Sequence, residues 1–448
     1  MAQNIQTIDV ADLIETQKAN WYRISIVVWA CAIMAFEGYD MQVLAYAAPS
    51  IIKAWHVNKA TFGQVFGLGL FGYMLGATLL GHLRDRFGRK KSIIGGCLWF
   101  GAFTFATGYA ATLPALFVLR FIAGIGLGVS IPNTIALAAE YSSLRVRATT
   151  IGAMFIGYNI GGALGGPIAA KYVPTLGWPI LFHVGGIAPI ILAVTLVFTL
   201  PESIRFLALK QNRPDRVAAI VAKLVPHQAI VPGTRFVLHE EIHGGLPVKN
   251  LFTEGRAMMT SLLWLAFAMS LVGHYFLTSW LPTVLSSSGV SMAHAVMAAA
   301  VFQIGGSCGN LIVTRFLDKR GTIAIAGAFA LATPLTVLIG FTGASDALLM
   351  VVVFLAGACI LGGQVGLNAV SGTVYPTYIR STGAGWAFGV GRIGSIIGPV
   401  IGGYLINVLP TSSLFICAAI PMLLCAAAAY FLGRAPVTAS ARQAPALS

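Results

Sequence analysis

The feature that most constrains this chain is its series of long apolar runs. About 20 apolar residues are needed for a helix to cross the hydrocarbon core of a bilayer. Backbone groups in lipid must bond within their own segment, which predicts helices, and unbroken runs do not fit the alternating strands of a membrane barrel. Twelve spans are expected, at 22–46, 60–82, 92–111, 115–138, 149–171, 178–200, 259–284, 293–315, 322–342, 347–374, 382–407 and 412–433.

Charged residues are too scarce for a water-soluble protein. They make up 9% of the 448 residues, whereas soluble proteins carry about 25%. We therefore expect an all-α membrane protein lying in a lipid bilayer. The six cysteines all fall in apolar spans without a C-x-x-C pair. We interpret them as small buried side chains and expect no metal and no cofactor.

The basic residues predict how the chain is oriented. With the amino terminus inside, 23 of the 28 Lys and Arg residues lie on the cytoplasmic side and three lie outside. This bias predicts that both termini are cytoplasmic, and it explains the net charge of +14 without a nucleic-acid partner. The start of the chain lacks the features of a cleaved signal peptide, so the first span is expected to remain as an anchor.

One long polar connection divides the spans six and six. The expected parts are a cytoplasmic segment at 1–21, a six-helix bundle at 22–200, a cytoplasmic linker at 201–258, a second six-helix bundle at 259–433 and a disordered tail at 434–448. Two parallel halves of this kind are typical of one large transporter architecture. We expect the protein to act as a monomer.

Several segments carry a family resemblance. Residues 81–91 (GHLRDRFGRKK) after the second span and 201–207 (PESIRFL) after the sixth resemble signatures of the major facilitator superfamily. Within it, residues 36–40 (FEGYD) and 47–50 (AAPS) resemble the aromatic acid:proton symporter family. Further support comes from 120–128 (RFIAGIGLG), 132–133 (PN), 278–283 (TSWLPT) and 389–392 (GVGR).

The resemblance spans about residues 20 to 433 and implies a function. It implies a secondary transporter in a bacterial inner membrane that imports a small aromatic carboxylate, such as a hydroxybenzoate, with protons by alternating access. The family pattern usually has Asp where this chain has Glu37. Because Glu is also an acid, the resemblance still implies proton coupling, but it does not fix the geometry around Glu37 or the substrate preference.

Three charged residues in the first half are candidates for proton coupling. A charged side chain at the centre of a span costs roughly 2.5–3.5 kcal/mol on insertion scales. Glu37 and Asp40 share a helix face, and Arg120 is expected at a similar depth. We hypothesise that one or both acids carry the coupled proton, because pairing and burial shift a carboxyl pKa in opposite directions. A structural ion pair is the alternative.

The second half offers an anion site. Arg392 is expected near the midplane, where a guanidinium could bind the substrate carboxylate through two parallel hydrogen bonds. Its alternative role is structural. Aromatic and amide side chains that could complete the pocket, or simply pack, are Tyr158, Asn159, Tyr275, Phe276, Gln303, Gln364, Asn368 and Trp386. For the lone histidines in spans, His183 and His274, packing is the expected role.

Charges in the cytoplasmic turns are candidates for gating. The resemblance implies that the turn around Asp85 holds charge pairs in the outward-facing state. We expect similar pairs between Glu140 and Arg147, and between Asp318 and its basic neighbours. Alternatively, the bases only set the topology. The candidate gating residues are Asp85, Arg86, Arg89, Glu140, Arg147, Asp318, Lys319, Arg320 and Arg380.

Other functions fit the sequence less well. A proton-coupled exporter is the main alternative, because residues 394–403 have antiporter-like spacing, although in the eleventh span and not the fifth. A transport-like sensor would be expected to carry an added signalling domain. An enzyme is disfavoured because the dinucleotide-like pattern at 389–394 and the hydrolase-like pattern at 305–309 both lie inside spans. The chain has no phosphate-binding loop for ATP.

Overall fold

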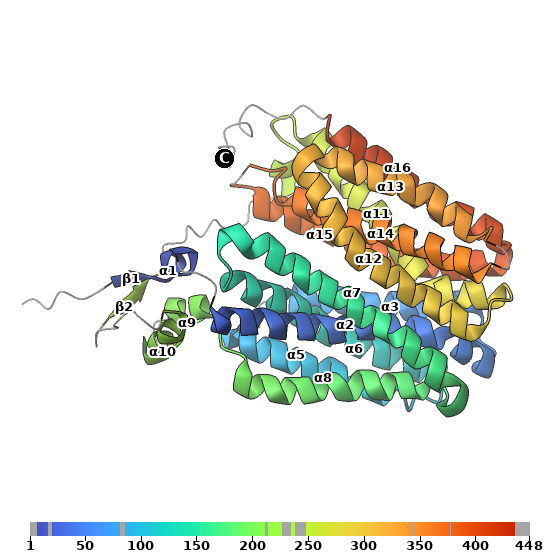
Figure 1. The fold of residues 1–448 in the computed structure, drawn as a ribbon, viewed down its shortest axis with the longest axis horizontal. Helices are drawn as coiled ribbons and strands as arrows, with labels where there is room; N and C mark the ends of the chain where they lie inside the picture. The colour runs from blue at the N-terminus through green and yellow to red at the C-terminus, as the bar shows by residue number, and fades with distance from the viewer. Residues whose placement is uncertain are drawn as a thin grey trace, which may run out of the picture. The chain divides into compact units, whose positions relative to one another are not determined.

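The computed structural model describes residues 7–16, 20–80, 86–210, 214–225, 234–237, 248–342, 345–376 and 378–434. Within these ranges twelve helices have 18 residues or more, and each overlaps one expected span (Figure 1). They are α2 (Trp21–Trp55), α3 (Lys59–Leu79), α5 (Arg89–Thr107), α6 (Leu113–Glu140), α7 (Leu144–Leu176), α8 (Pro179–Thr199), α11 (Ala257–Ser287), α12 (Met292–Arg320), α13 (Thr322–Ile339), α14 (Asp346–Ser371), α15 (Arg380–Val408) and α16 (Thr411–Leu432). The predicted all-α membrane fold is confirmed.

The first long helix is the one whose end the sequence predicts least well. The expected span stops at residue 46, whereas α2 continues to Trp55 with Pro49 inside the helix. A proline removes one backbone donor, but neighbouring groups in a membrane bundle satisfy the carbonyl that it frees. Pro167 and Pro174 likewise lie inside α7. Proline is therefore a poor mark of a helix end in this chain.

Apolar side chains on the outside of the helices fit a lipid environment. Ten of the described helices are long and apolar enough to cross a membrane. On α8, Ile187, Ile191, Val194 and Phe198 recur at helical spacing and are 46–83% exposed. A stripe of this kind would be unfavourable in water and is stable against lipid chains. Polar side chains with a function are then expected on the helix faces that point away from lipid.

The described residues form two compact units. The first comprises residues of Met1–Asp40, Phe71–Gly161 and Phe182–Ile242, and in it α5 packs along α6. The second comprises residues of Met41–Leu70, Gly162–Leu181 and His243–Ser448. In the second unit α12 packs along α14, α11 along α15 and α13 along α16 (Figure 1).

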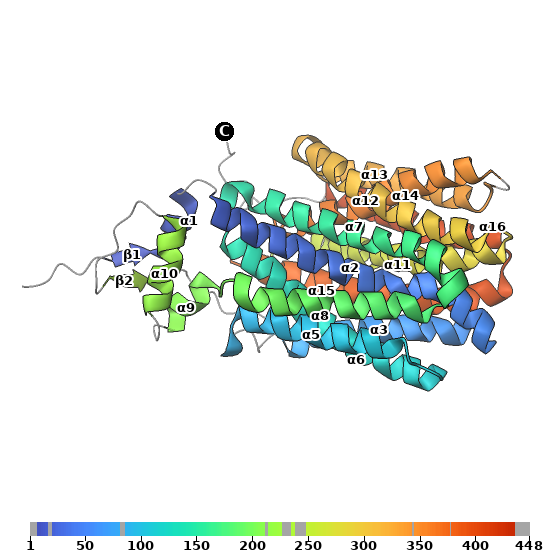
Figure 2. The ribbon, with the colours of Figure 1, turned by 60° about the horizontal axis from the view of Figure 1, so that its bottom comes forward.

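A small subdomain of the first unit lies outside the long helices. Strand β1 (Thr7–Asp9) pairs in parallel with β2 (Arg235–Val237), beside the short helices α1 (Val10–Thr16), α9 (Ile204–Lys210) and α10 (Pro214–Leu224) (Figure 2). Buried apolar residues of α1 and α10 hold it together, among them Val10, Ile14 and Val221. The 3-10 helix η1 (Val248–Leu251) precedes α11. The sequence analysis did not anticipate this subdomain.

Glycines set the distance between neighbouring helices. A Cβ added at Gly161 of α7 would lie 1.8 Å from the carbonyl oxygen of Ala35 in α2. In the second unit, a Cβ at Gly394 or at Gly398 of α15 would lie 2.4 Å from a backbone oxygen of α11. Only glycine allows backbones to come this close. The position of α2 against α7 therefore depends on Gly161.

Replacing Gly161 by Val should lower the thermal unfolding midpoint of the purified protein, because overpacking costs roughly 1–3 kcal/mol. Gly152→Val is the matched control, since Gly152 lies in the same helix with open space around its Cβ position. Thermal unfolding in detergent measures both variants. Equal losses of stability would contradict the assigned role of Gly161.

Candidate functional site

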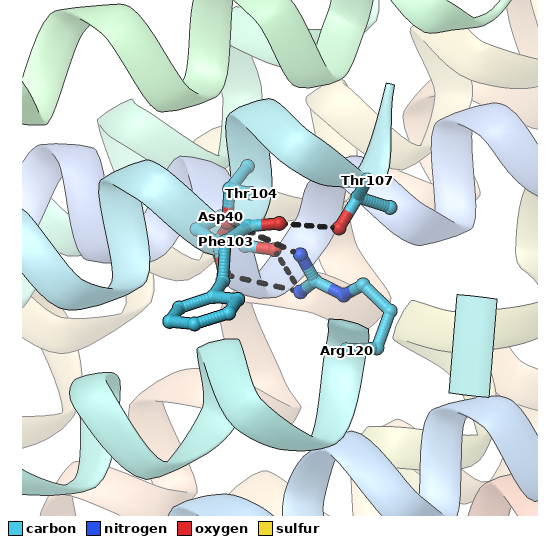
Figure 3. Close-up of polar contacts among 5 residues, drawn as sticks. All are labelled: Asp40, Phe103, Thr104, Thr107 and Arg120. Carbon is cyan, nitrogen blue, oxygen red and sulfur yellow. Dashed lines mark hydrogen bonds and ion pairs between the residues drawn. The ribbon is translucent and has the colours of Figure 1, made fainter. Parts of the chain in front are cut away.

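Two buried side chains of opposite charge in the first unit, Asp40 and Arg120, form an ion pair. Arg120 of α6 donates from Nη2 to Oδ2 of Asp40 at 3.0 Å and from Nη1 to Oδ1 at 3.2 Å (Figure 3). Nη2 also donates to the backbone carbonyl of Asp40 at 3.1 Å. The hydroxyl of Thr104 on α5 donates to the same carboxylate. Three helices thus converge on one carboxyl group.

This pair lies away from water. Asp40 is fully buried and Arg120 is 5% exposed. The guanidinium also stands over the ring of Phe182, 5.9 Å from its centroid. Such an arrangement is tolerated because the two charges neutralise each other and the Asp40 oxygens are hydrogen-bonded. Asp40 therefore has a built-in counter-charge in this conformation.

Glu37 has no such counter-charge in the first unit. It lies one turn before Asp40 on α2 and is also fully buried. Among the described residues, neither carboxyl oxygen has a partner at hydrogen-bonding geometry. The Ser130 hydroxyl lies beside the Glu37 carboxyl outside hydrogen-bond geometry, and the charge of Asp40 acts on it electrostatically. A buried carboxylate without a cation is very costly, so this environment favours the protonated acid.

Tyr158 and Asn159 belong to the helix that packs against these acids. A Cβ at Gly38, between the two acids, would lie 1.9 Å from the backbone oxygen of Tyr158. Asn159 is 3% exposed. The structure thus brings the Tyr158 segment of α7 directly beside the acidic segment of α2.

In the second unit, Arg392 lies beside two aromatic rings of α11. Its Nη1 donates to the hydroxyl of Tyr275 at 3.4 Å. The Tyr275 ring stacks on His274, with centroids 4.9 Å apart and planes at 30°. Phe276 is the next residue and is buried. The Arg392 guanidinium and the Tyr275 and His274 rings form a second cluster. The sequence predicted Arg392 and Tyr275 as pocket residues but not His274.

Amide side chains of α14 are linked to α11 by hydrogen bonds. The hydroxyl of Ser270 on α11 donates to Oε1 of Gln364, and Nε2 of Gln364 donates to Oδ1 of Asn368 at 3.3 Å. Both amides were predicted as pocket residues, whereas Ser270 was not. A lone serine in an apolar span gives no sequence signal that sets it apart from a packing residue.

Gln303 takes part in a hydrogen-bonded bridge that the sequence analysis missed. Its Nε2 donates to Oε1 of Gln42 at 3.2 Å, and Nε2 of Gln42 donates to the backbone oxygen of Thr278 at 2.8 Å. The bridge links α12, α2 and α11 within the second unit. Nearby, the fully buried Trp280 donates to the backbone oxygen of Pro399 at 2.8 Å. We call Gln42, Thr278, Gln303 and Trp280 the bridge cluster.

Trp386 does not join the Arg392 cluster. Its ring stacks on Trp264 of α11, with centroids 6.0 Å apart, and 45% of it is exposed. Trp386 lies six residues before Arg392 on α15, and its ring partner lies about three turns before Tyr275 on α11. The pocket position of Trp386 therefore stays a prediction.

The charges at the helix ends pair differently from the expectation. Glu140 at the end of α6 accepts from Arg89 Nη2 at 2.9 Å and from the hydroxyl of Ser203. Arg147 instead approaches Glu15, at 3.9 Å. The expected Glu140–Arg147 pair is wrong because the segment 201–203 and α5 supply nearer partners for Glu140, while α1 supplies one for Arg147.

Glu15 also binds the start of α7. Both of its carboxylate oxygens accept the backbone N–H of Leu144, at 2.9 and 3.0 Å. A carboxylate at a helix amino terminus is favourable because it meets unpaired N–H groups and the positive end of the helix dipole. Glu15 therefore ties α1 to α7 as well as neutralising Arg147.

The remaining gating candidates are only partly described. Asp85 and the side chains of Asp318 and Lys319 lie outside the described residues. Arg86 stands over the ring of Phe87, 5.4 Å from its centroid. Arg320 is exposed at the end of α12. None of these observations assigns a gate.

Arg380 lies in a polar cluster next to the start of α11. Its Nε donates to the backbone oxygen of Tyr375 at 3.2 Å. In the same unit Glu254 accepts from Arg256 and from the hydroxyl of Tyr378. The Arg256 hydrogen bond holds the pKa of Glu254 below its usual range. This cluster fastens the connection before α11 to the loop before α15.

Comparisons with known proteins agree with the helical membrane fold. A sequence profile described as the Major Facilitator Superfamily matches residues 29–344 and 320–447. The gallate transporter of Pseudomonas putida is 38% identical over 89% of each chain, and the 4-hydroxybenzoate transporter PcaK of Pseudomonas aeruginosa is 34% identical over 90% of each. A solved bacterial homologue of the human lysosomal transporter Spinster, inward-facing and occupied, has a TM-score of 0.72 and covers 96% of this chain and all of its own, with 15% identity.

Removing one partner of the Asp40–Arg120 pair should destabilise the protein more than removing both charges. Arg120→Gln leaves a buried carboxylate without its cation and should cost about 3–5 kcal/mol. The double variant Asp40→Asn with Arg120→Gln should recover most of that loss. Unfolding of the wild type, Arg120→Gln, Asp40→Asn and the double variant in detergent measures the coupling, and additive losses would contradict it.

Proposed function

This chain belongs to the major facilitator superfamily, and we propose that it imports a small aromatic carboxylate of the hydroxybenzoate kind by proton symport. The relatives that support this substrate class are named for gallate and 4-hydroxybenzoate. Both compounds combine a carboxylate with a hydroxylated benzene ring. A transporter for them needs an anion site, hydrogen-bonding groups for the ring and a way to couple protons.

Arg392 is the proposed carboxylate site. A guanidinium matches a carboxylate with two parallel hydrogen bonds, and the adjacent Tyr275 hydroxyl offers a further polar contact. Among the described helices from α11 to α16, the acids are Asp318 near the end of α12 and Asp346 at the start of α14. The amides Gln364 and Asn368 and the stacked rings of α11 are suited to a hydroxylated ring.

The observation that carries the proton coupling is the difference between the two acids of α2. Asp40 is neutralised by Arg120, whereas Glu37 is equally buried without a cation among the described residues. We assign the coupled proton to Glu37. The Asp40–Arg120 pair is the neighbouring group that responds when Glu37 gains or loses that proton. Exposing Glu37 to water would release the proton, and burying it again would require a new one.

We further propose how the transporter is oriented and gated. With both termini in the cytoplasm, α2 runs outward, Gln42 lies in its outer half, and the bridge cluster is an external gate. The Glu140–Arg89 pair then lies at the cytoplasmic side. The halves 22–200 and 259–433 would move against each other, and a few polar contacts at each end suffice to shift such an equilibrium.

Accumulation driven by a pH difference tests the proton site. Proteoliposomes with an alkaline interior should concentrate labelled 4-hydroxybenzoate, and Asp40→Asn should abolish this accumulation. Glu37→Gln should also abolish it but keep exchange of external for internal substrate, because Gln mimics the protonated acid. Asp346→Asn, an exposed acid paired with His294, is the control. Undiminished accumulation by Asp40→Asn or Glu37→Gln would contradict the assignment.

Arg392→Lys tests the anion site. Lysine keeps the charge but loses the planar pair of donors, and a charge-assisted hydrogen bond contributes roughly 1.5–3 kcal/mol. The KM for 4-hydroxybenzoate should therefore rise by about tenfold or more. Arg434→Lys, at the far end of the chain, should leave KM unchanged. An unaltered KM in Arg392→Lys would exclude a bidentate contact.

A further inference from the structure

His274 of α11 is a partly buried polar residue with no role in the proposed function. Its ring stacks on Tyr275, which in turn accepts a hydrogen bond from Arg392. Arg392 is also close enough to act on the imidazole electrostatically. Nδ1 of His274 is buried and, among the described residues, has no hydrogen-bond partner. An unpaired buried nitrogen costs roughly 1–3 kcal/mol, so its presence beside an anion site calls for a partner.

The neighbours of His274 on the same helix face are all paired. Ser270, His274 and Thr278 are four residues apart and therefore line one face of α11. The Ser270 hydroxyl donates to Gln364. The Thr278 hydroxyl donates to the backbone oxygen of His274 at 3.0 Å. The imidazole is thus the one side chain of this row, within the described structure, that keeps an unused buried polar atom.

The chemistry of an imidazole fits the second polar group of the proposed substrate. A neutral imidazole has one N–H donor and one acceptor nitrogen. A phenolic hydroxyl can both donate and accept, so it can pair with Nδ1 in either tautomer. The carboxylate of the same molecule is already assigned to Arg392. Tyr275 lies between the two residues, because it bonds Arg392 and stacks on His274. The aromatic ring between the two groups could lie along the Tyr275 and His274 rings.

We propose that His274 is a specificity-determining residue that hydrogen-bonds a ring hydroxyl of the substrate through Nδ1. This inference rests on the proposed function and sharpens it, because it separates hydroxylated from unsubstituted aromatic acids. A site built to bond a hydroxyl discriminates against an analogue that lacks it, since its own polar atom is then left unpaired. His274 would thus favour 4-hydroxybenzoate over benzoate.

The test compares two acids in three variants. His274→Phe keeps a planar ring against Tyr275 but removes both nitrogens, and His274→Ala removes the ring as well. Transport of labelled 4-hydroxybenzoate in proteoliposomes is inhibited with unlabelled 4-hydroxybenzoate or benzoate to give an affinity for each. Both variants should lose about tenfold in affinity for 4-hydroxybenzoate, equivalent to one hydrogen bond, and about twofold or less for benzoate.

A third variant and a control separate specificity from packing. His274→Asn restores a polar atom near the Nδ1 position and should recover most of the preference for the hydroxylated acid. His294→Phe, at an exposed histidine, should change neither affinity. Equal losses for both acids, or no loss for either, would overturn the role of His274 while leaving the proposed function intact. A wild-type protein that binds neither acid would overturn the proposed function and this inference together.

Discussion

The pairing of Asp40 with Arg120 is the interaction on which the rest of this structure depends. Two full charges away from water are stable only as a neutral, hydrogen-bonded pair, and α2, α5 and α6 meet at that pair. The backbone contact at Gly38 then presses the same segment of α2 against α7. Glu37 lies in the same segment of α2, and among the described residues neither of its carboxyl oxygens has a hydrogen-bond partner.

The two halves of the sequence use different chemistry inside the membrane. Both intramembrane acids lie on α2, next to a cation that one of them already neutralises. The described helices from α11 onward carry acids only near their ends, at Asp318 and Asp346, and they combine Arg392 with aromatic, amide and hydroxyl groups. In the proposed symport, the acids of α2 would serve the proton and the groups around Arg392 would serve the anion.

The sequence predicted the helices and the buried charges well because both follow from the free energy of transfer into lipid. It could not predict partners that depend on helix rotation or on segments far away in the chain. Arg147 pairs with Glu15, which comes from α1, and Glu140 pairs with Arg89. Gln42 carried no signal in an apolar span, yet it bridges three helices. The ring partner of Trp386, Trp264 of α11, was likewise not predictable from the sequence.

The most direct test of proton symport is the pH inside de-energised proteoliposomes after a pulse of external 4-hydroxybenzoate, recorded together with entry of the labelled acid. Because each carboxylate should enter with at least one proton that Glu37 delivers, the interior should acidify in proportion to the substrate that enters. Entry of the acid without any change in internal pH, or with alkalinisation of the interior, would contradict the account.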